Sequence, residues 1–301
     1  MKHPEKVIAV VGASGQQGKS VVEALVANGQ FRVRAITRNP GQYKGAAHEV
    51  VYADLDQPES LNEAFRGAYG VFGVTNAWQP GTDEIAQCRA MIAAAKTQQV
   101  EHFVWSTLPH VERLSGGRFD VPHFTNKARM DSEVSAAGFR FHSFVVAAFY
   151  YQNFLAGLSP ASNPDGSQGW MLPISPDADI AMADIAELGQ LVAGVFIRPE
   201  QTGHGLYLPH VGSTLSFNGI VSQLKQQGAD LRFSQVPIGL FAGTFPGSHE
   251  LAQMLAWFEA HGYFGDDYTK ERQLAAEFAG LKPTVFSDWA KANLKYGSAT
   301  Q

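Results

Sequence analysis

Three glycines near the start of the chain have a spacing that suits dinucleotide binding. Gly12, Gly15 and Gly18 form the pattern G-x-x-G-x-x-G between the apolar run Lys6–Val11 and a stretch with helical periodicity. Such glycines allow a tight turn and bring backbone N–H groups close to a pyrophosphate at a positive helix N-terminus. The alternative, a turn without a ligand, is less favoured because a strand and a helix flank the loop. We expect contacts with the cofactor from Gly12, Ser14, Gly15, Gln16, Gln17 and Gly18.

Arg38 indicates which dinucleotide the loop binds. It follows the predicted strand Phe31–Ile36, where NAD enzymes commonly carry an acidic residue that binds the ribose hydroxyls. A guanidinium can bind a 2′-phosphate through two parallel hydrogen bonds, whereas a carboxylate repels it. Arg38 therefore predicts NADP(H), the alternative being a solvated surface arginine. Asp54 follows a third strand and is expected to contact the adenine amine, or else to cap the helix near Pro58.

The predicted elements gather these residues at one edge of a sheet. Apolar runs alternate with helix-length segments, which predicts βαβ units and a parallel sheet with helices on both faces. Ligands bind at the carboxyl ends of such strands. Predicted strands are Lys6–Val11, Phe31–Ile36, Glu49–Ala53, Gly70–Val74, His102–Trp105 and Phe141–Val146. Predicted helices are Ser20–Ala27, Pro58–Phe65, Asp83–Thr97 and a segment from His123 to about Ala137. Residues that follow strand ends are Gly12, Arg38, Asp54, Thr75, Ser106 and Ala147.

The second half of the chain is less regular. Ser159–Gly169 is rich in polar residues, proline and glycine and predicts a loop. Later segments predict helices at Asp184–Phe196, Gly247–His261 and Lys270–Phe278, and a strand at Gly205–Leu208. We expect a doubly wound Rossmann-type α/β domain over residues 1–153, its sheet completed by part of residues 178–210. A smaller α/β C-terminal domain over residues 154–301 would bind a substrate or partner, with the cleft between the two.

Composition narrows the class of protein. The 301 residues are 45% hydrophobic and 17% charged, with a formal net charge of −5, which suits a globular protein and not a binder of nucleic acid. The single cysteine, Cys88, lies in an apolar helical stretch and is expected in the core. No apolar stretch approaches the roughly 20 residues of a membrane helix, so we expect a cytoplasmic protein. His204 and His210 lack further ligands for a metal, and no metal is expected.

Several stretches together resemble the NmrA-like proteins, an atypical branch of the extended short-chain dehydrogenase/reductases, over nearly the whole length. They are Gly12–Gly18, Thr37–Pro40, Val74–Asn76, Gly116–Arg118, His123–Lys127, Tyr151–Phe154, Met254–Phe258 and Gly262-Tyr263. The resemblance implies NADP(H) binding, a Rossmann domain and a smaller C-terminal domain. With the strand ends, it implies further cofactor contacts from Leu55, Thr75, Asn76, Lys127, Ala148, Phe149 and Tyr150.

The resemblance also defines where catalysis would occur. Typical short-chain dehydrogenases use Tyr-x-x-x-Lys, in which the lysine lowers the tyrosine pKa and the tyrosine transfers the proton. Here Lys127 is present, His123 stands in place of the tyrosine, and Ser106 matches the usual serine. The candidate catalytic residues are therefore Lys127, His123 and Ser106. An imidazole suits proton transfer at neutral pH, and the alternative is that His123 and Lys127 only hold cofactor or cap the helix.

Two functions remain open from the sequence. Some NmrA-like proteins are dinucleotide sensors that bind protein partners, whereas related branches are NADPH-dependent reductases. The missing tyrosine favours an NADP(H)-responsive redox sensor or regulator that acts through protein contacts, with a homo-oligomer possible in principle. The alternative is an NADPH-dependent reductase of a small carbonyl, imine or quinone that uses Lys127, His123 or both. The sequence names neither a substrate nor a partner.

Overall fold

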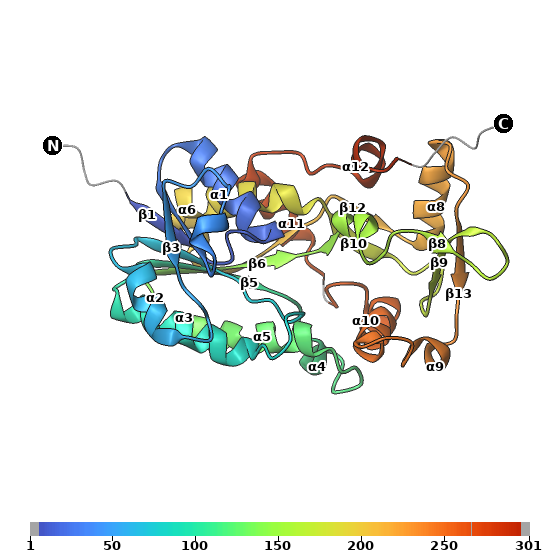
Figure 1. The fold of residues 1–301 in the computed structure, drawn as a ribbon, viewed down its shortest axis with the longest axis horizontal. Helices are drawn as coiled ribbons and strands as arrows, with labels where there is room; N and C mark the ends of the chain where they lie inside the picture. Colours follow the sequence, from blue (N-terminus) through green and yellow to red (C-terminus); the bar gives the residue numbers. More distant parts are fainter. Residues whose placement is uncertain (1–5, 266, 296–301) are drawn as a thin grey trace.

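A parallel seven-stranded sheet forms the larger part of the molecule (Figure 1). The computed structural model describes residues 6–265 and 267–295. The strand order is β11-β6-β5-β4-β1-β2-β3, and neighbouring strands are parallel throughout. The strands are β1 (Val7–Val10), β2 (Arg32–Thr37), β3 (Glu49–Tyr52), β4 (Gly70–Gly73), β5 (His102–Thr107), β6 (Phe141–Ala147) and β11 (His204–His210). The order reverses at β1 and β4, so the carboxyl ends of these strands flank the crevice where such sheets bind ligands.

Helices cover both faces of this sheet (Figure 1). One face carries α1 (Gln16–Asn28), α6 (Leu188–Ile197) and α11 (Thr269–Ala279). The other carries α2 (Pro58–Phe65), α3 (Glu84–Thr97) and α5 (Pro122–Ala136). In α1 the helical spacing of Val21, Val22 and Leu25 places all three in the core, and the helix ends at Gly29 in the left-handed region. This confirms the predicted doubly wound parallel sheet.

Residues 178–210 contribute to two different sheets. β11 takes the edge position beside β6, where the ring of Tyr207 stacks on Phe144. β10 (Ile180–Ala183) instead pairs with β7 (Phe149–Tyr150) and β12 (Ser213–Leu215) in a small three-stranded sheet. The division of the chain into two domains at residue 153 stays a prediction.

The prediction of a loop at Ser159–Gly169 is wrong in part. β8 (Ala161–Ser162) pairs antiparallel with the start of β9 (Gln168–Leu172), and β13 (Arg232–Gln235) adds to the other edge of β9. The polar residues that suggested a loop form the turn between β8 and β9, where the Asn163 amide donates to Ser167 Oγ. Strands of so few residues leave too little sequence pattern to be recognised.

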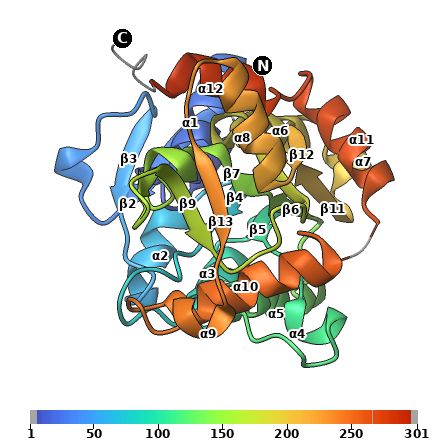
Figure 2. The ribbon, with the colours of Figure 1, turned by 90° about the vertical axis from the view of Figure 1, so that its right-hand side faces the viewer.

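The second half has a core of its own, rich in aromatic rings. Phe154, Trp170, Phe217 and Phe286 are almost fully buried there and contact one another. Figure 2 shows α10 (Ser248–His261) crossing the molecule beyond the ends of β9 and β13. The remaining helices are α4 (Val111–Leu114), α7 (Pro199–Thr202), α8 (Phe217–Gln226), α9 (Ile238–Phe241), α10 (Ser248–His261) and α12 (Phe286–Asn293). Short 3-10 turns lie at Pro40–Gln42, Tyr151–Leu155 and Ile185–Glu187. Within the part of the chain that the structure describes, no helix is long and apolar enough to cross a membrane.

Candidate dinucleotide and substrate cleft

One cavity of about 920 Å³ joins the carboxyl ends of the sheet strands to the second half of the molecule. Every site residue expected from the sequence lines it, although those residues come from distant parts of the chain. They are Gly12, Ser14, Gly15, Gln16, Gln17, Gly18, Arg38, Asp54, Leu55, Thr75, Asn76, Ser106, His123, Lys127, Ala148, Phe149 and Tyr150. The structure therefore brings the predicted set together, while the role of each residue stays a prediction.

The glycine loop offers free backbone donors to the cavity. Gly15 is the N-cap of α1 and has no side chain to cap the helix, and the first turn of α1 contains no acidic residue. The first N–H groups of α1 are thus available to an anion. A Cβ on Gly18 would lie 2.2 Å from the carbonyl oxygen of Gly12, so this glycine allows the helix to pack against the loop. The loop fits the pyrophosphate of a dinucleotide.

Arg38 and Asp54 lie at the same end of the cavity. Arg38 is exposed, and its guanidinium has no hydrogen bond or ion pair to any residue in the ranges 6–265 and 267–295. Asp54 Oδ1 accepts a hydrogen bond from the backbone N–H of Asp56, so it stabilises a turn before α2. The N-cap of α2 is Gln57, not Asp54. Asp54 still lines the cavity, where its second oxygen can accept from a ligand.

Lys127 is held by a buried network at the base of the cavity. Its ammonium lies 2.8 Å from the Thr75 carbonyl oxygen, 2.6 Å from Thr75 Oγ1 and 2.7 Å from Glu84 Oε1. Thr75 Oγ1 in turn donates to Glu84 Oε1 at 2.7 Å. Burial lowers the pKa of Lys127, and the Glu84 carboxylate opposes this change. All three N–H bonds of the ammonium therefore already have acceptors.

Ser106 belongs to a second chain of hydrogen bonds. Its hydroxyl donates to Gln17 Oε1 at 2.7 Å, and Gln17 Nε2 donates to the Tyr150 hydroxyl oxygen at 2.6 Å. Burial raises the pKa of Tyr150 to about 12. The Tyr150 hydroxyl thus stays protonated at neutral pH and does not readily supply the proton that the missing tyrosine would have given. Gln17 connects the glycine loop to the ends of β5 and β7.

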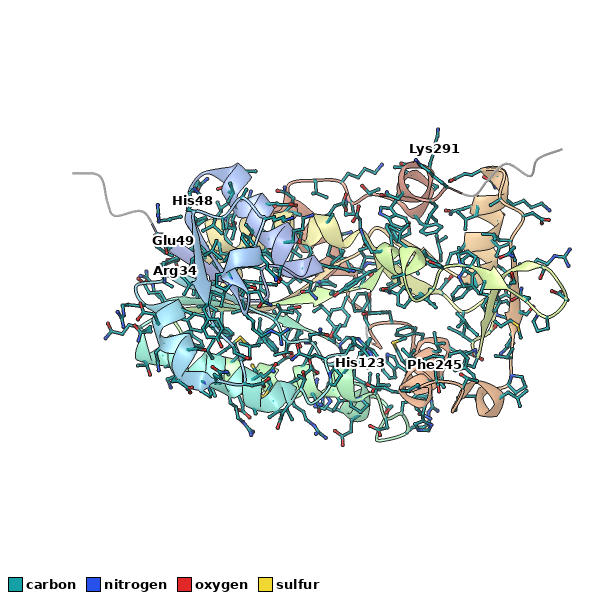
Figure 3. The ribbon with its side chains drawn as sticks, in the orientation of Figure 1. Arg34, His48, Glu49, His123, Phe245 and Lys291 are labelled. Carbon is teal, nitrogen blue, oxygen red and sulfur yellow. The ribbon has the colours of Figure 1, made fainter. Side chains whose placement is uncertain are left out.

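His123 lies where the two halves of the molecule meet (Figure 3). Glu250 of α10 accepts a hydrogen bond from the backbone N–H of His123 at 2.9 Å, and the same oxygen, Oε1, contacts ring Nδ1. The Trp78 ring packs against the imidazole with centroids 4.8 Å apart. Burial alone would raise the pKa of Glu250, but the hydrogen bonds from His123 hold it below its usual value. Glu250 is therefore ionised at neutral pH.

The far part of the cavity is apolar and aromatic. Beyond His123 it is lined by Phe124, Phe149, Leu158, Leu172, Phe217, Phe241, Phe245, Leu251, Met254, Leu255 and Tyr263. The Tyr263 hydroxyl donates to the Ala147 carbonyl oxygen at 2.9 Å and is thus directed into the structure and not toward a ligand. Such a surface favours a flat, uncharged ligand.

Sequence reasoning missed the two carboxylates that hold Lys127 and His123. Glu84 lies in the first turn of α3, and Glu250 lies in the first turn of α10. Acidic residues are common at such positions on the protein surface, because they interact favourably with the helix dipole. No local signal separates them from such surface residues. The apolar lining beyond Phe149 and Tyr150 was also not predicted: α8 and α9 were not recognised, and the predicted helix at Gly247–His261 gave no sign that Leu251, Met254 and Leu255 face the cleft.

A family model described as the NmrA-like family matches residues 4–291. The chain belongs to the NmrA-like family. It is 28% identical to an NmrA-like family domain-containing protein of Dictyostelium discoideum, over 95% of this chain and 97% of that protein. It is 29% identical to the NmrA-like family domain-containing oxidoreductase FrzB of a Cladobotryum species, over 93% of this chain and 91% of that protein.

The fold of the family is also evident in solved structures. The crystal structure of NmrA, a negative transcriptional regulator, in complex with NADP aligns with a TM-score of 0.79 at 22% identity, over 97% of this chain and 96% of that one. NmrA has also been solved in complex with NAD. The resemblance seen in the sequence is confirmed, and the chain has the NAD(P)-binding fold of NmrA-like proteins.

Proposed function

We propose that this NmrA-like protein is an NADP(H)-dependent oxidoreductase that reduces an uncharged, flat carbonyl, imine or quinone. The observation that carries the proposal is the continuous cavity, in which the glycine loop and Arg38 lie at one end and an aromatic compartment with His123 lies at the other. A protein that only binds a dinucleotide does not need a second compartment beside the nicotinamide. Curated relatives named as oxidoreductases, such as FrzB, support the same function.

The cofactor in this proposal is NADP(H) and not NAD(H). The support comes from Arg38, an exposed guanidinium at the end of β2 that lines the cavity and has no partner within residues 6–265 and 267–295. Bidentate binding to a 2′-phosphate would satisfy it. The bound cofactor would supply a hydride, and the protein would bind, orient and protonate the substrate.

Water exclusion is the second contribution of the protein. Among the residues that the structure describes, the lining of the compartment beyond His123 is apolar and aromatic, with no Lys, Arg, Asp or Glu. Exclusion of bulk water would protect the reduced nicotinamide from side reactions and strengthen the electrostatic interactions with the transition state. The lining also selects substrates, since it cannot solvate a charged group.

A regulator that responds to NADP(H) is the second candidate. The observation in its favour is a set of apolar side chains exposed near the cleft. Leu240 is 71% exposed, Trp78 is 55% exposed and Phe245 is 46% exposed. Trp78 and Phe245 also line the cavity, so a bound cofactor could alter the surface offered to a protein partner. The partner, the oligomeric state and the cytoplasmic location stay predictions.

One preparation of the protein can test both candidates. NADPH oxidation would be measured against a panel of quinones, aromatic aldehydes, aryl ketones and cyclic imines, and sedimentation would be measured with and without NADPH and NADP⁺. We expect turnover with at least one uncharged aromatic acceptor, and loss of most of that turnover in His123→Gln. Turnover that His123→Gln leaves unchanged would contradict the proposed site. No turnover, together with a cofactor-dependent change in assembly, would favour the regulator.

A further inference from the structure

We infer that Glu250 is a positioning residue that holds the His123 ring with Nδ1–H toward its carboxylate, so that Nε2 is the atom that protonates the substrate. The inference rests on the proposed reductase function and names the proton donor that the site would use. It also assigns different tasks to His123 and Lys127, which the sequence left as equal candidates.

The hydrogen-bond geometry fixes the state of Nδ1. An ionised carboxylate only accepts hydrogen bonds, so the ring nitrogen in contact with Glu250 Oε1 must carry the hydrogen. The hydrogen bonds from His123 hold the pKa of Glu250 below its usual value despite burial, which keeps it an acceptor. The backbone N–H of His123 donates to the same oxygen at 2.9 Å and fixes the position of the carboxylate.

The other ring nitrogen is left for the ligand. His123 lines the cavity, and Nε2 has no hydrogen-bond partner among the residues that the structure describes. The Trp78 ring packs against one side of the imidazole, with centroids 4.8 Å apart, and restricts its rotation. Only 9% of the His123 side chain is exposed, so the ring is largely shielded from bulk water.

Lys127 is poorly placed to act as the acid. Each N–H of its ammonium is already directed at an acceptor, two on Thr75 and one on Glu84. Donation to a substrate would break one of these buried bonds and leave its acceptor without a partner. His123 needs no such exchange, because Nε2 has no bond to give up.

In the proposed reduction, the hydride adds to the carbonyl carbon and the proton adds to its oxygen. The carbonyl carbon gains the hydride that NADPH would supply on oxidation to NADP⁺, and it forms a C–H bond while the C=O π bond breaks toward oxygen. The oxygen takes the proton from Nε2 of the His123 imidazolium, which becomes a neutral imidazole that retains Nδ1–H toward Glu250. After the product leaves, a proton from water restores the imidazolium.

The alternative role of Glu250 is purely structural, and the experiment must distinguish it from the positioning role. The N-cap of α5 is Val121, whose side chain cannot accept a hydrogen bond, so Glu250 also caps α5 through the His123 N–H. A residue that only caps a helix would affect stability without affecting which ring nitrogen carries hydrogen. The tautomer of His123 is therefore the decisive readout.

The first experiment measures that tautomer in the full chain. Long-range proton–nitrogen NMR on protein labelled with ¹⁵N-histidine reports which ring nitrogen is protonated, and His123→Gln assigns the signal. We expect Nδ1 to be protonated in the wild type, and the neutral ring to shift toward the Nε2–H form in Glu250→Ala. His261, which ends α10 and whose ring contacts Arg118, serves as an internal control whose signals should not change. A wild-type ring without hydrogen on Nδ1 would overturn the inference.

The second experiment uses kinetics with an acceptor found in the panel. Glu250→Gln keeps an oxygen that can cap α5 but removes the charge, so the fold is expected to survive. We expect its kcat to fall on the order of 10- to 100-fold with little change in KM for NADPH, a part of what a general acid contributes. Wild-type kcat in this variant would overturn the positioning role and leave the proposed function intact. Absence of turnover in the wild type would instead remove the proposed function, and the proton donor with it, whatever the tautomer.

Discussion

The Lys127 ammonium lies 2.7 Å from Glu84 Oε1, and both side chains are almost fully buried. The pair brings a helix from one βαβ unit into contact with a helix from the next, α3 with α5, directly beneath the cofactor end of the cavity. A lone charge in such a place is costly, whereas a paired one is tolerated. A lysine predicted to contact the cofactor is thus also one half of a buried ion pair.

Removing one partner of this pair should destabilise the fold. We expect Lys127→Met to lower the free energy of unfolding by roughly 3–5 kcal/mol, because the Glu84 carboxylate is left buried without a cation. The double variant Lys127→Met with Glu84→Gln should lose less than the sum of the two single losses. Denaturation in urea measures all four proteins. Strictly additive losses would show that the two groups do not depend on each other.

Two glycines of the loop should give opposite defects. A Cβ on Gly15 would lie 3.3 Å from the Gly12 carbonyl oxygen, and Gly15 has an ordinary φ of −83°, so the backbone accepts a side chain there. Gly15→Val should therefore keep the fold and lose dinucleotide binding, because the side chain occupies space that the pyrophosphate needs. Gly18→Ala should lose stability instead, since its Cβ would lie 2.2 Å from the same oxygen. Calorimetric titration and thermal unfolding distinguish the two; binding that survives in Gly15→Val would contradict the site.

Arg38 should determine the preference for NADP(H). Loss of a charge-assisted hydrogen bond to phosphate costs about 1.5–3 kcal/mol, which is roughly 10- to 150-fold in affinity. We expect Arg38→Ala to lose this much affinity for NADP(H) and little for NAD(H), as measured by calorimetry. Lys44→Ala is a suitable control, because Lys44 is an exposed cation nearby that does not line the cavity. An unchanged preference in Arg38→Ala would mean that another group reads the phosphate.

Asp131 should make stability depend on pH. Burial raises its pKa to about 7, and the hydrogen bond of 3.0 Å from Tyr207 opposes this only in part. The unfolded chain releases this proton near pH 3.9, so the free energy of unfolding falls as pH rises from about 4 to about 7. Asp131→Asn cannot ionise and should be more stable than the wild type near pH 8, on the order of 2–4 kcal/mol.

Urea denaturation of Asp131→Asn and the wild type at about pH 5 and about pH 8 provides the test. The difference between the two proteins should grow with pH. Asp230→Asn, at an exposed position after α8, controls for the loss of a negative charge. A difference that is the same at both pH values would show that Asp131 is already ionised in the folded protein at low pH.

The first half of the fold could be predicted because each element carries a strong local pattern. β1 is a short apolar run, β2 and β3 are rich in β-branched residues, and α1 and α3 bury one helical face, so the periodicity and the turn residues between the elements agree. The small sheets could not be predicted. β10 is buried along its whole length and β7 has only two residues, so neither shows an alternation that separates a strand from a loop. α8 did leave a signal, a Ser216 cap ahead of Phe217, Ile220 and Leu224.

The site residues also fall into those that the sequence could predict and those that it could not. Residues that follow strand ends, such as Arg38 and Thr75, could be predicted, since a parallel sheet gathers strand ends at one edge. Glu250 could not, because it lies 127 positions from His123 and their contact depends on how α10 packs against α5. Cys88 is buried as expected, and burial raises the pKa of its thiol, so it remains a core residue.

The position of β11 at the edge of the sheet limits where the chain can be truncated without exposing a strand. Because β11 hydrogen-bonds along the outer edge of β6, a fragment that stops before residue 204 would leave the backbone groups of a long, apolar strand open to solvent. It would also uncover Phe144, which Tyr207 shields. Open edges of this kind recruit strands from other chains. A shortened version is thus expected to self-associate, and studies of nucleotide binding are better served by substitutions in the intact chain.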